Sequence, residues 1–169
     1  MTRTFAAALA LAALSAGGSA DPAAAQDYAA ERVVKAVDQA DLAAIATSLG
    51  HTVKELGKGE DTFVAAETPE GIVYLLFGTA CNVNGVEGCQ GVMIQARYDL
   101  PEGTTLEKLA KTNEAQAAIT VTADFADKAL VFTRYHVLDH GVTMANIREN
   151  VNVLLSVVDD AYPMAAGQE

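Results

Sequence analysis

The residues that point most directly to chemistry are the two cysteines of the chain, Cys81 and Cys89. Seven residues rich in Asn and Gly separate them, and strand-like apolar runs lie on either side, at 72–77 and 92–98. This pattern is typical of a hairpin loop with a cysteine at each foot, so the two thiols should face each other. In an oxidising compartment they are expected to form a structural disulfide. The alternatives are a redox-active pair, which usually has C-x-x-C spacing, and a metal site, which needs further ligands.

Histidine and serine offer little support for catalysis. His136 and His140, with Asp139 between them, are residue types that bind metal ions. Their segment, however, is predicted to be a strand that ends in a turn. They would need a third ligand from elsewhere in the chain. Outside the first 25 residues the serines are Ser48 and Ser156, each in a predicted helix rather than in a G-x-S-x-G turn. We therefore expect a protein that is not an enzyme and holds no metal or cofactor.

Two arginines stand in apolar strands, where a buried charge requires a partner. Arg97 and Arg134 are expected either to pair with acidic residues on a helix or to anchor a carboxylate or anionic ligand. In the second case Tyr74, Arg97 and Arg134 would share one face of a sheet and line a small-ligand pocket.

The elements that position these residues follow from periodicity and capping signals. Helices are predicted over 38–49, 104–116 and 143–162, and strands over 52–56, 62–67, 72–77, 92–98, 119–125 and 130–137. The unbroken apolar run at 72–77 indicates a central strand that is covered on both faces. The order α-β-β-β-β-α-β-β-α predicts an α+β fold, an antiparallel sheet of about five to six strands with helices packed on it.

The last predicted helix carries an apolar stripe, which consists of Met144, Ile147, Val151, Leu154 and Val158. The stripe is most simply part of the core. Met144 and Ile147 are also candidates for a face that contacts a partner protein or a second copy of the chain.

The first 25 residues have the three parts of a secretory signal peptide. Arg3 provides a positive start, residues 5–16 are apolar, and small residues precede an expected cleavage between Ala25 and Gln26. The apolar run is too short to anchor the chain in a membrane. We expect export to the periplasm or the exterior, then a lead-in at 26–37, one domain at 38–162 and a loose tail at 163–169.

Charge restricts the partners. The chain has 22 Asp and Glu against 11 Lys and Arg, a formal net charge of −11. The signal segment contains one Arg and one Asp, so cleavage leaves that charge unchanged. Nucleic acids and anionic membranes need a positive surface on their partner, and so neither is expected to bind.

Residues 41–162 resemble the YbjN domain family, a bacterial group of sensory transduction regulators. The resemblance rests on Leu49-Gly50 at the end of the first helix, on the cysteine-bounded hairpin followed by Ala96-Arg97-Tyr98, and above all on residues 130–147 with Gly141-Val142-Thr143. It implies a fold similar to type III secretion chaperones, with a surface for partner proteins and no catalytic residues. Relatives often carry a Trp-Asn pair after the second helix, where this chain has only Asn113.

The resulting expectation is an exported, non-enzymatic domain that acts as a chaperone-like or regulatory adaptor. Its partner would be another protein, or a second copy in a homodimer. The alternative is the small-ligand module with the pocket at Arg97 and Arg134.

Overall fold

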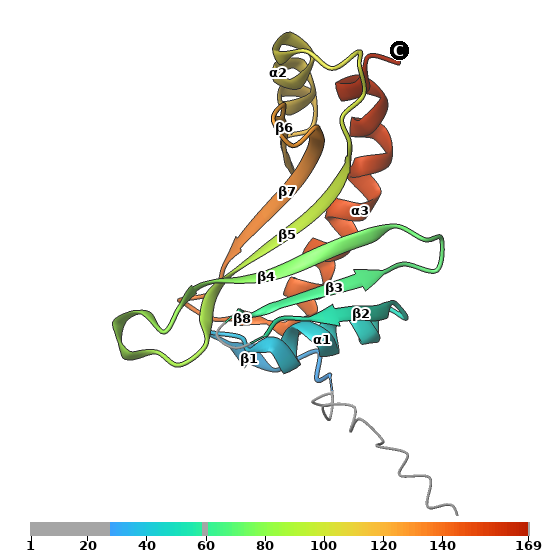
Figure 1. The fold of residues 1–169 in the computed structure, drawn as a ribbon. Coiled ribbons are helices and arrows are strands. Elements are labelled where there is room, and N and C mark those ends of the chain that lie inside the picture. Colours follow the sequence, from blue (N-terminus) through green and yellow to red (C-terminus); the bar gives the residue numbers. More distant parts are fainter. Residues whose placement is uncertain (1–27, 59–60, 169) are drawn as a thin grey trace, which may run out of the picture.

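Strands with alternating apolar residues assemble into one six-stranded antiparallel sheet (Figure 1). The structure is a computed structural model, and it describes residues 28–58 and 61–168. The strands, in the spatial order β2-β3-β4-β5-β7-β6, are β2 (Thr52–Leu56), β3 (Phe63–Glu67), β4 (Val73–Cys81), β5 (Cys89–Asp99), β7 (Ala129–Val137) and β6 (Thr120–Asp124). This confirms the predicted α+β class.

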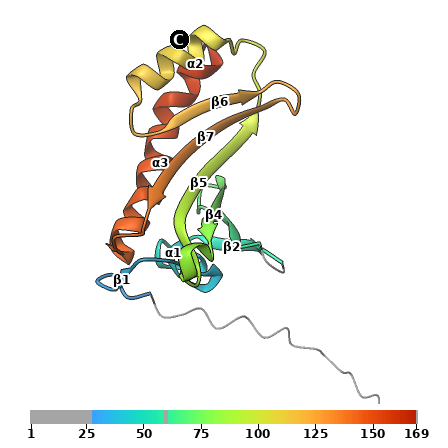
Figure 2. The same cartoon turned by 90° about the vertical axis from the view of Figure 1, so that its left-hand side faces the viewer.

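The three α-helices of the described residues are α1 (Gln39–Ser48), α2 (Leu106–Ala115) and α3 (Met144–Ala166). The first packs against β2 and β3, α3 packs against β5 and β7, and α2 packs against α3 and β6. Figures 1 and 2 show α3 along one side of the long strands β5 and β7, with no helix on the other side.

Side-chain caps begin each helix. Asp38 forms a capping box with Asp41 at the start of α1, and the Thr143 hydroxyl accepts from the Asn146 amide at the start of α3. Both caps lie where the sequence predicted them. The start of α2 is shifted by one residue, because Thr105 rather than Thr104 is its cap.

The core lies between the sheet and the helices α1 and α3. Its largest fully buried side chains include Tyr74, Phe132, Leu76 and Ile94 from the strands. Along β4, Tyr74 and Leu76 are buried whereas Val73 is 51% exposed. The strand is therefore central, as predicted, but the expectation of cover on both faces is wrong, because the described helices pack on one face only.

The segment that precedes α1 is part of the fold. Its strand β1 (Val33–Val34) pairs with β8 (Val142–Thr143) in a second, two-stranded sheet. The carbonyls of Arg32 and Ala30 accept hydrogen bonds from the amides of Met144 and Ala145. These amides belong to the first turn of α3, which has no partner within the helix. The lead-in thus caps the last helix.

The predicted end of α3 at 162 is wrong. The helix continues through Pro163 to Ala166, and Ala165 and Ala166 are buried rather than part of a loose tail. A proline inside a helix removes one backbone hydrogen bond. Packing of the last turn of α3 against α2 holds the helix together beyond it. Gly167, with φ 72°, ends the helix. The predicted signal peptide and the cleavage site at Ala25 and Gln26 lie outside the described residues.

Candidate functional site

The face of the six-stranded sheet opposite α1 and α3 bears no helix in the described part of the chain, and we call it the open face (Figure 2). Side chains alternate between the two faces of a strand, and residues paired across strands share a face. Register and burial therefore place on the open face the side chains of Phe63, Ala65, Val73, Leu75, Phe77, Met93, Gln95, Arg97, Val131, Thr133, Tyr135 and Val137.

A row of large uncharged side chains crosses the open face at right angles to the strands. Phe63, Phe77, Met93 and Tyr135 lie directly opposite one another on β3, β4, β5 and β7, and we call this row the apolar ladder. The rings of Phe63 and Phe77 have centroids 6.0 Å apart. Tyr135 is 54% exposed and the adjacent Val137 is 55% exposed. Phe63, Phe77 and Met93 are half-buried, and exposed apolar side chains beside them are typical of interaction sites.

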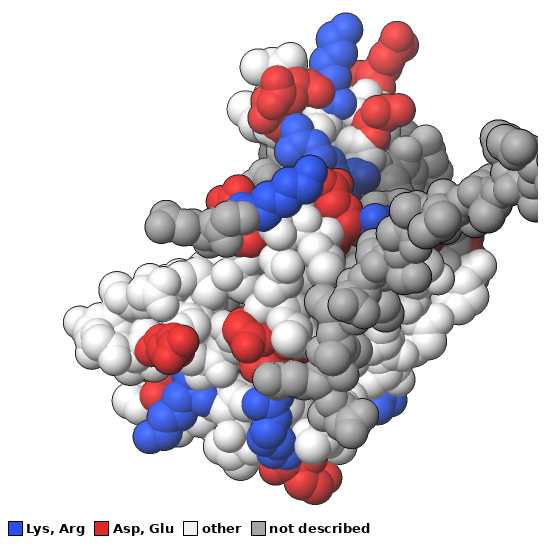
Figure 3. All heavy atoms as spheres, turned by 60° about the horizontal axis from the view of Figure 1, so that its bottom comes forward, with Lys and Arg blue, Asp and Glu red and all other residues white. Residues whose placement is uncertain are grey.

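Charged residues lie beside the apolar ladder rather than in it. Lys54 pairs with Glu67 at 2.6 Å, and Arg97 pairs with Asp127 at 3.7 Å. Such exposed pairs contribute little to stability. On the face shown in Figure 3, acidic and basic side chains form small groups separated by uncharged surface. The four residues of the ladder, Phe63, Phe77, Met93 and Tyr135, carry no charge, so the ladder itself offers mainly apolar contact area.

The disulfide joins β4 and β5 at the base of their hairpin loop. Cys81 and Cys89 lie directly opposite each other on β4 and β5, joined by an S–S bond of 2.07 Å, so the predicted pairing is present. Two hollows adjoin it. One, of about 370 Å³, is lined by Asp61, Thr62, Phe63, Phe77, Gly78 and Cys81. The other, of about 410 Å³, is lined by Ala36, Val37, Asp38, Asp41, Thr62, Cys81, Asn82, Glu87, Gly88 and Cys89.

The proposed pocket of Tyr74, Arg97 and Arg134 does not exist. Arg97 lies opposite Val131 on the open face, whereas Arg134 lies opposite Ile94 on the helix-covered face. Tyr74 is 1% exposed and belongs to the core. The two arginines therefore point away from each other on opposite sides of one sheet.

Neither arginine pairs with an acidic residue of a helix. Arg97 pairs with Asp127 in the β6–β7 turn. Arg134 donates from its Nε to the Asn150 Oδ1 of α3, and from its Nη1 to the Ala118 carbonyl. Asn150 in turn donates to the Asn146 carbonyl at 2.8 Å. The charge is thus held by neutral acceptors, which makes Arg134 a structural residue.

The expectation that Met144 and Ile147 form a partner face is wrong. Both are completely buried, as are Val151 and Leu154 of the same stripe. The stripe packs against the sheet, and α3 contacts β5 and β7 there. These residues belong to the core and are unavailable to a partner of the folded protein.

The histidines do not converge. His140 is exposed, with its Nε2 4.0 Å from Asp139, whereas His136 is half-buried on the helix-covered face. Burial and the nearby charge of Arg134 lower the pKa of His136, despite a hydrogen bond with Asn146. Within residues 28–58 and 61–168, no group of three or more His, Cys, Asp or Glu could hold a metal ion.

The remaining histidine contacts the core. The Nδ1 atom of His51 lies 2.8 Å from the hydroxyl of Tyr74. Burial raises the pKa of Tyr74 and lowers the pKa of His51, so near neutral pH a protonated phenol meets a neutral imidazole. This hydrogen bond links the half-buried His51 to the core side chain of Tyr74.

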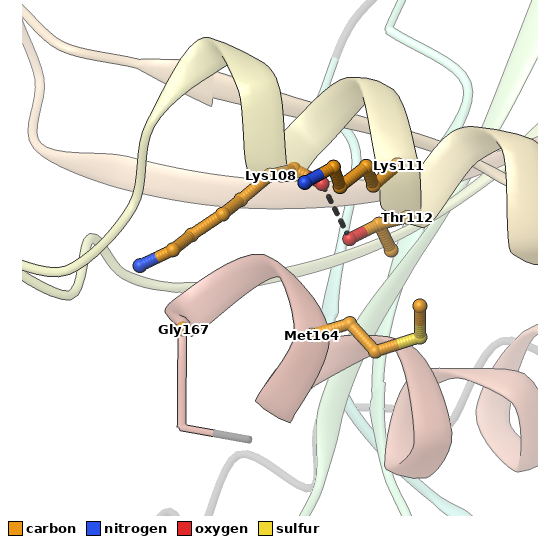
Figure 4. A pocket seen from close by; sticks show the side chains of 5 residues that line it. All are labelled: Lys108, Lys111, Thr112, Met164 and Gly167. Atoms are coloured by element: carbon orange, nitrogen blue, oxygen red, sulfur yellow. Dashed lines mark hydrogen bonds between the residues drawn. The ribbon is translucent and has the colours of Figure 1, made fainter.

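A further hollow, of about 460 Å³, lies between α2 and the end of α3 (Figure 4). Its lining includes Lys108, whose ammonium donates to the Gly103 carbonyl at 2.7 Å and lies close to Gly167. The C-terminal end of a helix has partial negative charge, so this ammonium stabilises α3. The hollow is therefore part of the contact between α2 and α3, with the Lys108 ammonium at the C-terminal end of α3.

Sequence reasoning overlooked Phe63, Phe77 and Tyr135. The available signal was the alternation of β3 and β7: with Val64 and Phe132 assigned to the core, Phe63 and Tyr135 fall on the opposite face.

None of the described helices is long and apolar enough to cross a membrane.

Comparison with known protein families identifies a family for this chain. The profile of YbjN, described as "Putative bacterial sensory transduction regulator", matches residues 38–166. The chain belongs to the YbjN family. This confirms the resemblance seen in the sequence. No curated protein matches the sequence significantly.

Solved structures with the same fold include the YbjN protein of E. coli, which is 14% identical with a TM-score of 0.50, the match covering 72% of this chain and 88% of that one. Two type III secretion chaperones also match. The structure of the HopA1-SchA chaperone-effector complex matches at 10% identity and a TM-score of 0.50, covering 73% of this chain and 96% of that one. The structure of the ExsC-ExsE complex matches at 15% identity and a TM-score of 0.51, covering 75% and 90%. The chaperone-like fold expected of this family is therefore confirmed.

Proposed function

We propose that this YbjN-family protein is an exported, non-enzymatic adaptor or regulator that binds another protein through the open face of its sheet. The observation that carries the proposal is the apolar ladder of Phe63, Phe77, Met93 and Tyr135, on a face that the described helices leave uncovered. Burying such side chains against a partner releases water from apolar surface and drives association.

The comparisons support a protein partner. The two chaperones with this fold were solved in complexes with proteins, HopA1 and ExsE. The description of the YbjN family names a regulator of sensory transduction. A second copy of this chain is the competing partner, but each copy carries a net charge of −11. Long-range repulsion between two such chains disfavours self-association relative to a neutral or basic partner.

Export to the periplasm or the exterior is the second part of the proposal. It rests on the signal-peptide pattern of residues 1–25 and on the Cys81–Cys89 disulfide, which persists in an oxidising compartment. Cleavage after Ala25 would leave the segment from Tyr28 to Val34, which packs on α3, in the mature protein. The mass of the protein from the periplasmic or culture fraction should correspond to a chain that begins at Gln26.

Site-specific photo-crosslinking in the native host tests the adaptor function. A photoreactive amino acid at Tyr135 should yield an adduct with one other protein, whereas the same group at Leu106, which is 73% exposed on α2, should not. Val137→Asp should abolish the adduct, and Leu106→Asp should leave it intact. Adducts of the protein with itself, equal adducts from both positions, or no adduct would contradict the proposal.

A further inference from the structure

The two hollows beside the disulfide share a boundary but differ in chemistry. Thr62 and Cys81 line both. The hollow on the open face has the rings of Phe63 and Phe77, the first two members of the apolar ladder, on its wall. The hollow on the other side of the boundary has three carboxylates, Asp38, Asp41 and Glu87, with no lysine or arginine among the described residues that line either hollow.

Gly78, on the lining of the apolar hollow, has no room for a side chain. A Cβ atom on Gly78 would come within 2.6 Å of the Cys89 sulfur and 2.7 Å of the Thr62 methyl group, so a larger residue would displace the disulfide or the neighbouring strand. Thr62 and the Cys81 end of the disulfide line the hollow. Its volume of about 370 Å³ is enough for a large aliphatic or aromatic side chain.

Three backbone hydrogen bonds hold the wall of the acidic hollow. Val37 and Cys89 exchange amide-to-carbonyl bonds of 3.0 and 2.8 Å, which tie the disulfide loop to the segment before α1. The Asn82 amide donates to the Gly88 carbonyl at 2.8 Å and closes the loop on itself. This wall is a built surface, so it can present a fixed charge to a partner.

Two of the four carboxylates on these linings are available to a partner. Asp41 is occupied by Arg32, and Asp38 caps the amide of Asp41. Asp61 and Glu87 are exposed, and no ion pair engages either of them in the described part of the chain. The lysine nearest to Asp61 in the sequence is Lys58, and its backbone carbonyl accepts a hydrogen bond from the Asp61 amide.

We infer that the paired hollows receive a segment of a partner protein in which a large apolar side chain stands close to a lysine or arginine. This inference rests on the adaptor function proposed above and names the chemistry of the partner. The apolar side chain enters the hollow beside the Phe63 and Phe77 rings, and the basic side chain reaches Asp61 and Glu87. Complementary charge decides in favour of this occupant, since a second copy would bring a chain of net charge −11 to an acidic rim.

A random 12-residue peptide library displayed on phage is the probe, selected on the oxidised mature protein. Peptides that combine a Phe, Leu or other large apolar residue with a nearby Lys or Arg should be enriched. The selected peptide is then measured by fluorescence anisotropy against Asp61→Asn/Glu87→Gln. Its affinity should fall about fivefold, as expected for the loss of two exposed charge contacts.

The matched control is Glu102→Gln/Glu114→Gln, which changes two exposed carboxylates around α2 by the same total charge and should leave the affinity unchanged. Phe77→Ala should abolish binding, whereas Phe125→Ala, at a 54% exposed position in the β6–β7 turn, should not. Acidic selected peptides, an equal loss in both double variants, or binding that survives Phe77→Ala would overturn the inference. The photo-crosslink from Tyr135 would survive those results if the adaptor function is correct, so the two failures are distinguishable.

Discussion

The side chain of Asn113 forms hydrogen bonds with the sheet edge that a neighbouring strand would otherwise form. It accepts from the Val121 amide at 2.7 Å and donates to the Val121 carbonyl at 2.9 Å. Val121 lies on β6, the outermost strand on that side, so these two backbone groups have no strand neighbour. An edge strand with unpaired backbone N–H and C=O groups can pair with a strand of another chain. We therefore expect Asn113 to stabilise the fold and to keep β6 from aggregating.

Asn113→Ala would leave both backbone groups of Val121 without their partners. An unsatisfied buried donor or acceptor costs about 1–3 kcal/mol. Val121 is 2% exposed, but water can replace part of the lost bonding at the edge of a sheet. We expect the free energy of unfolding to fall by about 2 kcal/mol for the two groups together. With a urea m-value of about 2 kcal/mol/M, the midpoint would fall by about 1 M.

Urea unfolding with the disulfide intact measures this loss. The m-value should stay the same, and the Val121 amide should exchange with solvent faster in the variant. Asn152→Ala is the matched control, because the Asn152 side chain donates to the exposed Glu149 and its removal should cost less than about 0.5 kcal/mol. Equal stability of the two variants would refute the edge-capping role.

Three further predictions concern the disulfide, the core and pH. Cys81→Ser/Cys89→Ser should lower the free energy of unfolding by about 2.5 kcal/mol on the chain-entropy estimate, and wild type in reductant should show the same loss in urea. Ile147→Asp should prevent folding, because it puts a carboxylate at a fully buried position, whereas Tyr135→Asp on the open face should cost less than about 1 kcal/mol; circular dichroism and urea unfolding distinguish them. His136 has a lowered pKa in the folded state, so the unfolded chain binds its proton more readily and stability should decrease as pH falls below 6.5. In His136→Gln the loss of stability between pH 7.5 and 5.5 should be smaller, and an unchanged loss would contradict this role.

Local signals allowed much of the fold to be predicted from the sequence. Asp38 and Thr143 mark the starts of two helices because a short polar side chain there satisfies free backbone amides. Asn84 and Gly85 mark the β4–β5 turn because both tolerate the positive φ that it requires, and the flanking cysteines mark its disulfide. Each of these features depends on residues that are close together in the chain.

The register between strands could not be predicted from such local signals. Arg97 and Arg134 both lie in predicted strands, yet whether they share a face depends on how β5 pairs with β7. A slip of one residue moves every side chain of a strand to the other face. In this protein Arg97 pairs with Val131, three positions before Arg134, and an odd separation places the two arginines on opposite faces.

The end of α3 shows how tertiary packing overrides a local signal. Pro163 predicts the end of a helix, since it cannot donate a backbone hydrogen bond. The helix nevertheless continues to Ala166, because Ala161 and Ala165 are completely buried there. This burial depends on α2, whose position cannot be derived from the sequence of α3.

The corrections change where a partner of this protein can bind. Met144 and Ile147 would have allowed the last helix to bind a partner, but α3 uses its apolar stripe to cover the sheet. A partner that required that stripe would have to unfold the core, at a cost comparable to the whole stability of a domain. The open face requires no such opening, because Tyr135 and Val137 are already half exposed. Any association of the folded protein that is driven by apolar burial is therefore expected to begin on the sheet rather than on the helix.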